Sequence, residues 1–159
     1  MSRPLGHYLD TRCELHAQGD YSMNAQPYLS MAPADLYKLC CWREARGESL
    51  DAKRAQAHSV MNRVNLPSWW GHDLSSVILC KWQFSSFNEG DPNEKKWPDD
   101  NDPSFIDCST VCDAILSGTD EDPTSGADSY YDTSIPEPYW AVSAQLTLEV
   151  DHFRFFVTR

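Results

Sequence analysis

The chain has 159 residues, of which 41% are hydrophobic and 12% aromatic, which is enough apolar material for one folded domain with its own core. Its formal net charge is −11, from 13 basic and 24 acidic residues. That excess of acids argues against a nucleic-acid-binding protein, which needs a basic face, and against stable association with an anionic membrane. No segment approaches the ~18 consecutive apolar residues that a membrane-spanning helix needs.

The first 30 residues mix glycine, proline, glutamine and charges without sustained periodicity. We interpret residues 1–30 as an N-terminal arm or lead-in, and residues 31–159 as a single domain. Residues 1–30 also lack the apolar run of a secretion signal, so the chain is expected to be made in a cytoplasm. Any target outside the cytoplasm would then be reached by another route.

Six cysteines are present: Cys13, Cys40, Cys41, Cys80, Cys108 and Cys112. For a cytoplasmic chain, reduced and buried thiols are the expectation, although three disulfides remain an alternative. No CxxC pair occurs, and the five histidines are scattered without ligand spacing. We therefore predict no metal site and no cofactor.

Two loops contribute most of the negative charge. Residues 87–102 carry six acids against two lysines, and residues 119–132 carry five acids and no base. Solvated loops explain this pattern most simply. A calcium site is the alternative, because Asp120, Asp122 and Thr124 stand at alternate positions, although Gly126 falls one residue late for an EF-hand loop.

Apolar residues at helical spacing predict two consecutive helices after the arm. The first begins near Pro33, which suits a first helical turn, and Gly47 is expected to stop it. The second begins at Ser49 or Asp51, whose side chains can cap it, and ends before Pro67.

Further along the chain, residues 73–80 are predicted to form a short helix, and a long polar and aromatic loop over 81–102 follows. Loops of that length in compact domains usually have a function or move. Asp102 and Pro103 then begin a third long helix, which Gly118 ends.

Helical spacing disappears after this point, and three short strands are predicted instead, at Tyr130-Tyr131, 145–150 and 153–157. The last two strands can form a hairpin around Asp151. Helices followed by a few strands predict an α+β fold, mainly helical with a small C-terminal antiparallel β element.

The residues with the clearest chemistry are Arg43-Glu44-Ala45-Arg46-Gly47-Glu48, at the end of the first predicted helix. An acid near a helix C-terminus faces the negative end of the helix dipole, which disfavours its charged form. Desolvation by Trp42 and by the aromatic loop would raise its pKa further. A carboxylic acid that stays protonated near neutral pH can donate a proton to a leaving oxygen, as glycosidic bond cleavage requires. The alternative is a surface turn in which the two acids pair with the two arginines.

Five short motifs, taken in order, resemble those of the SleB-type cell wall hydrolases, the spore cortex-lytic enzyme family. They are the Glu-Ala-Arg-Gly-Glu stretch that begins at Glu44, the Asn62-Arg63-Val64 helix, the Gln83-Phe84-Ser85 loop, the Gly126-Ala127 segment with Tyr130-Tyr131, and the closing His152 to Phe156 strand. Together they cover about residues 35–157. Two departures from the family pattern are Asp151 before the last strand and Asp132-Thr133 after the tyrosines.

The resemblance implies a lysozyme-like fold and cleavage of peptidoglycan between N-acetylmuramic acid and N-acetylglucosamine. Family members resemble lytic transglycosylases, in which one glutamic acid protonates the glycosidic oxygen and its carboxylate then takes a proton from the muramic acid 6-hydroxyl. The product is a 1,6-anhydro sugar. We therefore predict that Glu44 is the catalytic acid and base, in a protein that acts as a monomer.

Six further residues are predicted to bind the substrate or support the site: Glu48, Gln83, Phe84, Ser85, Tyr130 and His152. Gln83 and Ser85 can bond sugar hydroxyl or acetamido groups, and Phe84 with Trp82 can offer stacking surfaces. Tyr130 can orient the substrate, whereas core packing of the tyrosine and a purely structural role for His152 are the alternatives. Asn62 and Arg63 are expected to support the turn that carries Glu44.

Two other functions remain open. A hydrolytic muramidase would need a second carboxylate, and Glu48 is the only obvious candidate in the motif. A peptidoglycan-binding protein without activity would have no need of Glu44. Because the chain shows no secretion signal or repeat-type wall-binding module, we expect a phage or prophage endolysin, made in the host cytoplasm and acting on the wall after release.

Overall fold

The computed structural model describes residues 26–159, so most of the predicted arm lies outside the described part of the chain. The elements are α2 (Gln26–Leu29), α3 (Pro33–Ala45), α4 (Leu50–Asn65), α5 (Leu74–Leu79), η3 (Ser85–Phe87), α6 (Pro103–Leu116), β1 (Ser129–Asp132), η4 (Tyr139–Val142), β2 (Gln145–Val150) and β3 (Phe153–Val157). The predicted helices and strands are all present. Within the described residues, the ordered structure reaches back to α2, which places Tyr28 in the core.

The helices begin where the sequence places capping side chains. Ser49 accepts a hydrogen bond from the Ala52 amide at 3.3 Å and caps α4. Asp102 accepts one from the Ser104 amide at 2.8 Å and caps α6, with proline next in the chain. These local bonds explain why both helix starts could be predicted.

The end of α3 differs from the prediction. The helix stops at Ala45, and Arg46 caps it in the right-handed conformation, with its amide donating to the Trp42 carbonyl. Gly47 is not among the glycines with positive φ, so it does not act as a left-handed helix cap. By contrast, Gly118 after α6 has φ +74° and fills that role as predicted.

The three strands form one antiparallel sheet in the order β1-β3-β2. β2 and β3 are the predicted hairpin, and Asp151 at its turn adopts φ +48°. β1 pairs along the other edge of β3, with Tyr130 opposite Phe155. This pairing puts β1, which carries Tyr130, next to the last strand of the chain.

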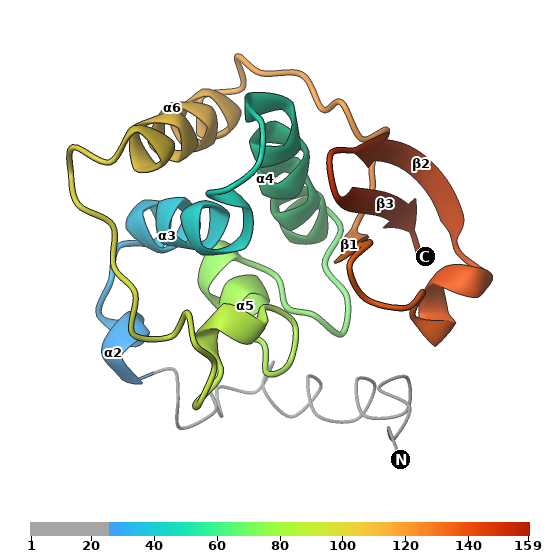
Figure 1. Cartoon of the computed structure of the whole chain (residues 1–159), viewed down its shortest axis with the longest axis horizontal. Helices are drawn as coiled ribbons and strands as arrows, with labels where there is room; N and C mark the ends of the chain where they lie inside the picture. Colours follow the sequence, from blue (N-terminus) through green and yellow to red (C-terminus); the bar gives the residue numbers. More distant parts are fainter. Residues whose placement is uncertain (1–25) are drawn as a thin grey trace.

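Helix α4 lies between the other helices and the sheet (Figure 1). On one side it packs with α3, α5 and α6 around the larger core. On the other side its small residues Ala52 and Ala55 contact Phe153 and Phe155 of β3. Alanines leave room for the aromatic face of the sheet, so the strands approach the end of α3 closely.

The cysteines only partly follow the expectation. Cys40, Cys41, Cys108 and Cys112 are free thiols buried in the helical core. Burial is one cause that raises the pKa of each of Cys40, Cys41 and Cys108, which keeps those three as unreactive thiols. Cys80 is disulfide-bonded, so the expectation of a reduced thiol was wrong at this position. No helix within residues 26–159 is long and apolar enough to span a membrane.

Candidate active site

The carboxylate of Glu44 stands in the last turn of α3, half-buried, with a hydroxyl donor on each oxygen. Ser86 donates to Oε1 at 2.8 Å and Tyr130 donates to Oε2 at 2.8 Å. Burial raises the pKa of Glu44, and the nearby negative charge of Asp91 adds to that rise. The Ser86 and Tyr130 hydrogen bonds and the positive charge of Arg43 oppose it, but the net shift is upward. The environment therefore shifts the pKa of Glu44 upward, in the direction predicted from the sequence.

The source of the desolvation differs from the prediction in one respect. Trp42 does not face Glu44, because its indole nitrogen donates to Asp102 at 2.9 Å and Arg46 lies over its ring. Trp82 and Phe84 do line the same cavity as Glu44.

Arg43, the neighbour of Glu44, fixes the long loop over residues 81–102. Its buried guanidinium donates to the carbonyl oxygens of Ser86 at 3.1 Å, Glu94 at 2.7 Å and Lys96 at 3.0 and 3.1 Å. Aromatic rings of Tyr28, Phe87 and Trp97 surround it, with centroids 4.9 to 5.3 Å from the guanidinium carbon. Arg43 thus positions the backbone of Ser86, whose hydroxyl bonds Glu44.

The surface-turn interpretation of this stretch does not hold. Arg46 donates to the Asn93 side chain at 2.7 Å rather than to either acid. Within the described part of the chain, neither Glu44 nor Glu48 forms an ion pair with Arg43 or Arg46. Among the described residues, Glu44 therefore has no ion-pair partner, although the nearby charge of Arg43 lowers its pKa.

Tyr130 reaches Glu44 from the middle of β1. Its ring packs against Phe153 and Phe155, each with centroids 5.3 Å away, and the Gln56 amide donates to its hydroxyl at 3.4 Å. Burial raises the pKa of Tyr130 well above its ordinary value, so the phenol keeps its proton and can donate it to Glu44.

Glu44 opens into a cavity of about 400 Å³ between α3, the 81–102 loop and the sheet. Its lining includes the predicted residues Gln83, Phe84, Ser85 and Tyr130. Ser85 is exposed at the cavity, whereas Phe84 is buried and lies 5.5 Å from the Arg63 guanidinium, so Phe84 serves mainly as a support. Arg63 in turn donates to the Gln83 side-chain oxygen at 3.0 Å and orients that amide.

Two functional candidates were missed by the sequence analysis. Ser86, rather than its neighbour Ser85, bonds Glu44, and an irregular loop gives no periodicity that could tell the two serines apart. Asp132 lines the same cavity, because it lies two residues after Tyr130 in β1 and so shares its side of the strand. Asp132 is a second carboxylate in the cavity that holds Glu44.

Glu48 and His152 contact each other away from the cavity. The Glu48 carboxylate lies 3.1 Å from His152 Nδ1, and the neighbouring Asp151 accepts a hydrogen bond from the Ser49 amide at 2.7 Å. The contact with Glu48 raises the pKa of His152. Neither side chain lines the cavity, so the pair ties the α3–α4 turn to the β2–β3 hairpin.

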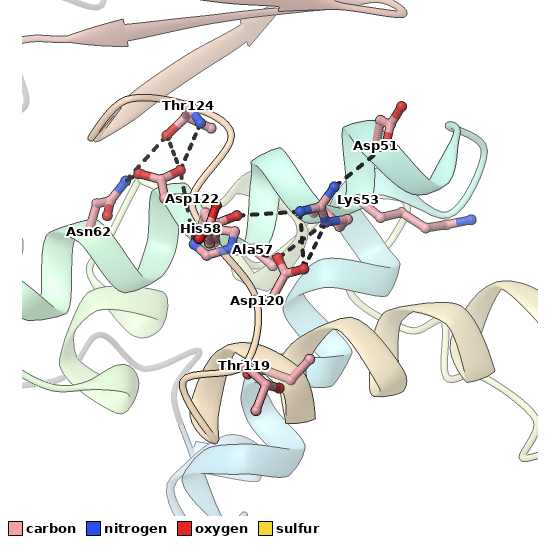
Figure 2. Close-up of polar contacts among 12 residues, drawn as sticks. Asp51, Lys53, Ala57, His58, Asn62, Thr119, Asp120, Asp122 and Thr124 are labelled. Atoms are coloured by element: carbon pink, nitrogen blue, oxygen red, sulfur yellow. Dashed lines mark hydrogen bonds and ion pairs between the residues drawn. The ribbon is translucent and has the colours of Figure 1, made fainter.

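Asn62 supports a different segment from the one predicted. Its amide donates to Asp122 at 3.0 Å (Figure 2). It also donates to the Ala127 carbonyl at 2.9 Å, and both partners lie on the loop that leads into β1. The expectation that Asn62 supports the Glu44 turn was wrong. Its effect on the site runs through β1, which carries Tyr130.

Asp120 and Asp122 of the 119–132 loop are bonded to other protein groups. Asp120 contacts His58 Nε2 at 2.8 Å and forms an ion pair with Arg54 at 3.0 Å. Asp122 accepts hydrogen bonds from the Thr124 amide and hydroxyl at 2.8 and 2.6 Å (Figure 2). Across residues 26–159, no group of three or more histidine, cysteine or acidic side chains is placed to hold a metal ion. Through their contacts with Arg54, His58 and Asn62, Asp120 and Asp122 anchor the loop to α4.

A desolvated carboxyl that is bonded by two hydroxyl groups and faces a cavity defines a candidate site for acid-catalysed cleavage. The comparisons with known proteins identify the class. A family model described as Cell Wall Hydrolase matches residues 47–156. The chain belongs to this family and is a peptidoglycan-cleaving enzyme. The match begins three residues after Glu44, so the role of Glu44 rests on the geometry above.

Two solved structures show the same fold. The catalytic domain of the germination-specific lytic transglycosylase SleB from Bacillus anthracis has a TM-score of 0.63 and 19% identity, over 87% of this chain and 98% of that one. The catalytic domain of the Bacillus cereus SleB protein has a TM-score of 0.61 and 20% identity, over 87% and 94%. The α+β, lysozyme-like prediction is confirmed. No curated protein matches the chain.

Replacing Arg43 with lysine tests the arrangement around the loop. A lysine keeps the charge but cannot serve three carbonyl oxygens in the fixed geometry of a guanidinium. We expect Arg43→Lys to lower the unfolding free energy by about 2–4 kcal/mol and to reduce wall-cleaving activity with it, because buried hydrogen-bond acceptors lose their donors. Thermal unfolding and a turbidity assay on purified cell walls measure the two effects.

The control is Arg54→Lys on α4, which alters a partly exposed ion pair with Asp120 of the 119–132 loop instead of the bonds to the 81–102 loop. It should cost less than about 1 kcal/mol. Equal stability and activity losses in the two variants would contradict the positioning role of Arg43.

Proposed function

We propose that the chain is a lytic transglycosylase that cleaves the bond between N-acetylmuramic acid and N-acetylglucosamine with Glu44 as its one catalytic acid. The observation that carries the proposal is the carboxyl of Glu44, which is desolvated, forms no ion pair within the described part of the chain and is bonded by Ser86 and Tyr130. Such a group holds a proton near the glycosidic oxygen of a glycan in the cavity.

In the first step, Glu44 transfers its proton to the glycosidic oxygen while the bond from that oxygen to the muramic acid C1 breaks. In the second step, the Glu44 carboxylate accepts the proton of the muramic acid 6-hydroxyl. The 6-oxygen bonds C1 and closes the 1,6-anhydro ring, so no water is consumed and Glu44 regains its proton.

The two hydroxyl neighbours suit this double role. A serine or tyrosine hydroxyl can donate to a carboxylate and accept from a carboxylic acid, since its hydrogen rotates. Ser86 and Tyr130 can therefore stay bonded to Glu44 in both protonation states. That limits the reorganisation needed between the two steps, which is the condition for efficient electrostatic stabilisation.

Hydrolysis is the second candidate, because Asp132 shares the cavity with Glu44. A hydrolytic muramidase needs a second carboxylate, either as nucleophile or as a base that activates water. Asp132 lies ~7 Å along β1 from Tyr130 by strand geometry, and its Oδ1 accepts a hydrogen bond from the Ser134 amide at 2.8 Å. It takes the place that the sequence analysis gave to Glu48 in this alternative.

The products of digestion separate the two mechanisms. Wild type, Glu44→Gln and Asp132→Asn are incubated with purified peptidoglycan, and the released fragments are weighed by mass spectrometry. We expect anhydro-muramic ends from wild type and from Asp132→Asn, and a rate loss on the order of 10³-fold in Glu44→Gln, because a general acid supplies that much.

Glu121→Gln, on an exposed side chain, is the matched control and should behave as wild type. Reducing muramic ends that disappear in Asp132→Asn would overturn the transglycosylase assignment in favour of hydrolysis. Unchanged products from Glu44→Gln would overturn the assignment of the acid itself.

We further propose that the enzyme acts as a monomeric endolysin, released onto the wall without stable membrane association. The net charge of −11 supports the last point, because it disfavours adhesion to anionic lipid. Produced inside a bacterium, the protein should lyse the cells only once the inner membrane is permeabilised. Culture turbidity measures lysis, and lysis without permeabilisation would contradict the endolysin role.

A further inference from the structure

A second cavity of about 300 Å³ adjoins the one that holds Glu44. The two share Arg63, Trp82, Gln83, Tyr130 and Trp140, so they form one continuous lined surface. The second cavity adds Trp69, Ser129 and Thr158. Its volume is at the lower end of the range for small-ligand sites, roughly 300–1,000 Å³, and it suits one substituent or ring of a longer ligand.

The side-chain amide of Gln83 has an unused donor at this place. Arg63 donates to its oxygen at 3.0 Å, which fixes the amide with its nitrogen on the other side. That nitrogen is shielded from solvent and has no hydrogen-bond partner among the described residues. An unpaired buried donor costs about 1–3 kcal/mol, so a donor retained in a cavity wall indicates a partner that arrives with a ligand.

Two hydroxyl oxygens in the same cavity can accept hydrogen bonds from an occupant. Ser129 and Thr158 both donate their hydrogens to the buried carboxylate of Asp128, at 2.9 and 2.7 Å. With their hydrogens committed, these hydroxyls offer only acceptor lone pairs to an occupant. Arg63 and Tyr130 line the cavity too, but Arg63 is buried and donates to the Asp128 carbonyl and the Gln83 oxygen, and the Tyr130 hydroxyl is bonded to Glu44 and Gln56. The polar groups left for an occupant are thus one amide donor and two acceptors, beside the buried positive charge of Arg63.

The remaining walls are indole rings. Trp69 and Trp140 are half-buried, whereas Trp82 is 45% exposed and holds φ +70°, a left-handed conformation that is unfavourable for a bulky residue. Because the Gln83 nitrogen is shielded in the free protein, an occupant reaches it only when a neighbouring side chain moves. Trp82 precedes Gln83, borders both cavities and is the exposed group best placed to move.

We propose that the second cavity binds the acetamido group of an N-acetylated sugar in the glycan strand. The acetamido carbonyl accepts from Gln83, its N–H donates to the hydroxyl oxygen of Ser129 or Thr158, and its methyl group packs on the indoles. Arg63 is a positioning residue that orients Gln83. The assignment rests on the proposed function, since it takes the glycan as the ligand of the adjoining cavity.

A neutral secondary amide fits this set better than the other groups of a glycan. A sugar hydroxyl could use the donor and an acceptor but would leave the apolar walls uncovered. A carboxylate would be attracted by the Arg63 charge, but it would find only one free amide donor, would face two acceptor oxygens that repel it, and would have its charge buried against the indoles. The site therefore selects for the N-acetyl substituent.

Binding without turnover tests the assignment. Tryptophan fluorescence of full-length Glu44→Gln protein is titrated with tetra-N-acetylchitotetraose and with cellotetraose, which carries hydroxyls in place of the acetamido groups. We expect the acetylated glycan to bind at least roughly tenfold tighter than cellotetraose. Gln83→Glu in the same background should weaken binding of the acetylated glycan by roughly tenfold, because the acetamido carbonyl would lose its hydrogen-bond donor.

Gln83→Glu keeps the oxygen that faces Arg63 and removes only the amide donor. The charge-matched control is Gln145→Glu, on the exposed end of β2, which should bind the glycan within about twofold of the parent protein. If Gln83→Glu fails to fold, as judged by circular dichroism, Thr158→Val removes one acceptor instead and should weaken binding by roughly three- to tenfold. Equal binding of the two oligosaccharides, or unchanged binding in the substituted protein, would overturn the subsite. The digestion products would still decide the role of Glu44 separately.

Discussion

The site depends on one interaction, the bonding of the buried Arg43 guanidinium to three carbonyl oxygens of the 81–102 loop. A desolvated cation is costly, and here the cost is offset by four hydrogen bonds to those carbonyls and by the surrounding aromatic rings. Because Arg43 directly precedes Glu44, the residue that fixes the loop is rigidly linked to the acid. The loop carries Ser86, which bonds Glu44, and Gln83, which lines the cavity. Both residues are therefore positioned by the bonds from Arg43 to the loop.

Glu44 itself is destabilising in the charged form. Its pKa is raised above the ordinary 4.5, so between 4.5 and the raised value the folded protein holds a proton that the unfolded chain has released. The free energy of unfolding therefore falls as the pH rises through that window. The helical core and the packing of β3 on α4 offset this cost. Proteins commonly accept such local losses where catalysis needs a shifted acid.

The elements were predictable because their signals are local. Asp102 and Pro103 mark the start of α6, and Ser49 caps α4, each within a few residues of chain. The position of Glu44 followed from the helix that carries it. The roles of Ser86 and Asp132, by contrast, arise from contacts between segments far apart in sequence, and so does the placement of β1 beside β3. Pairing of distant segments depends on the packed whole, which short motifs do not encode.

The most direct test of the account is the pKa of Glu44 in the folded protein, measured by carbon NMR of its side-chain carboxyl as the pH is varied. The account predicts a pKa above 4.5, which rises further in Ser86→Ala because a hydrogen bond that lowers it is removed. A pKa at or below 4.5 in the wild-type protein would contradict the account. The site would then not favour the protonated form of Glu44 that must donate to the glycosidic oxygen.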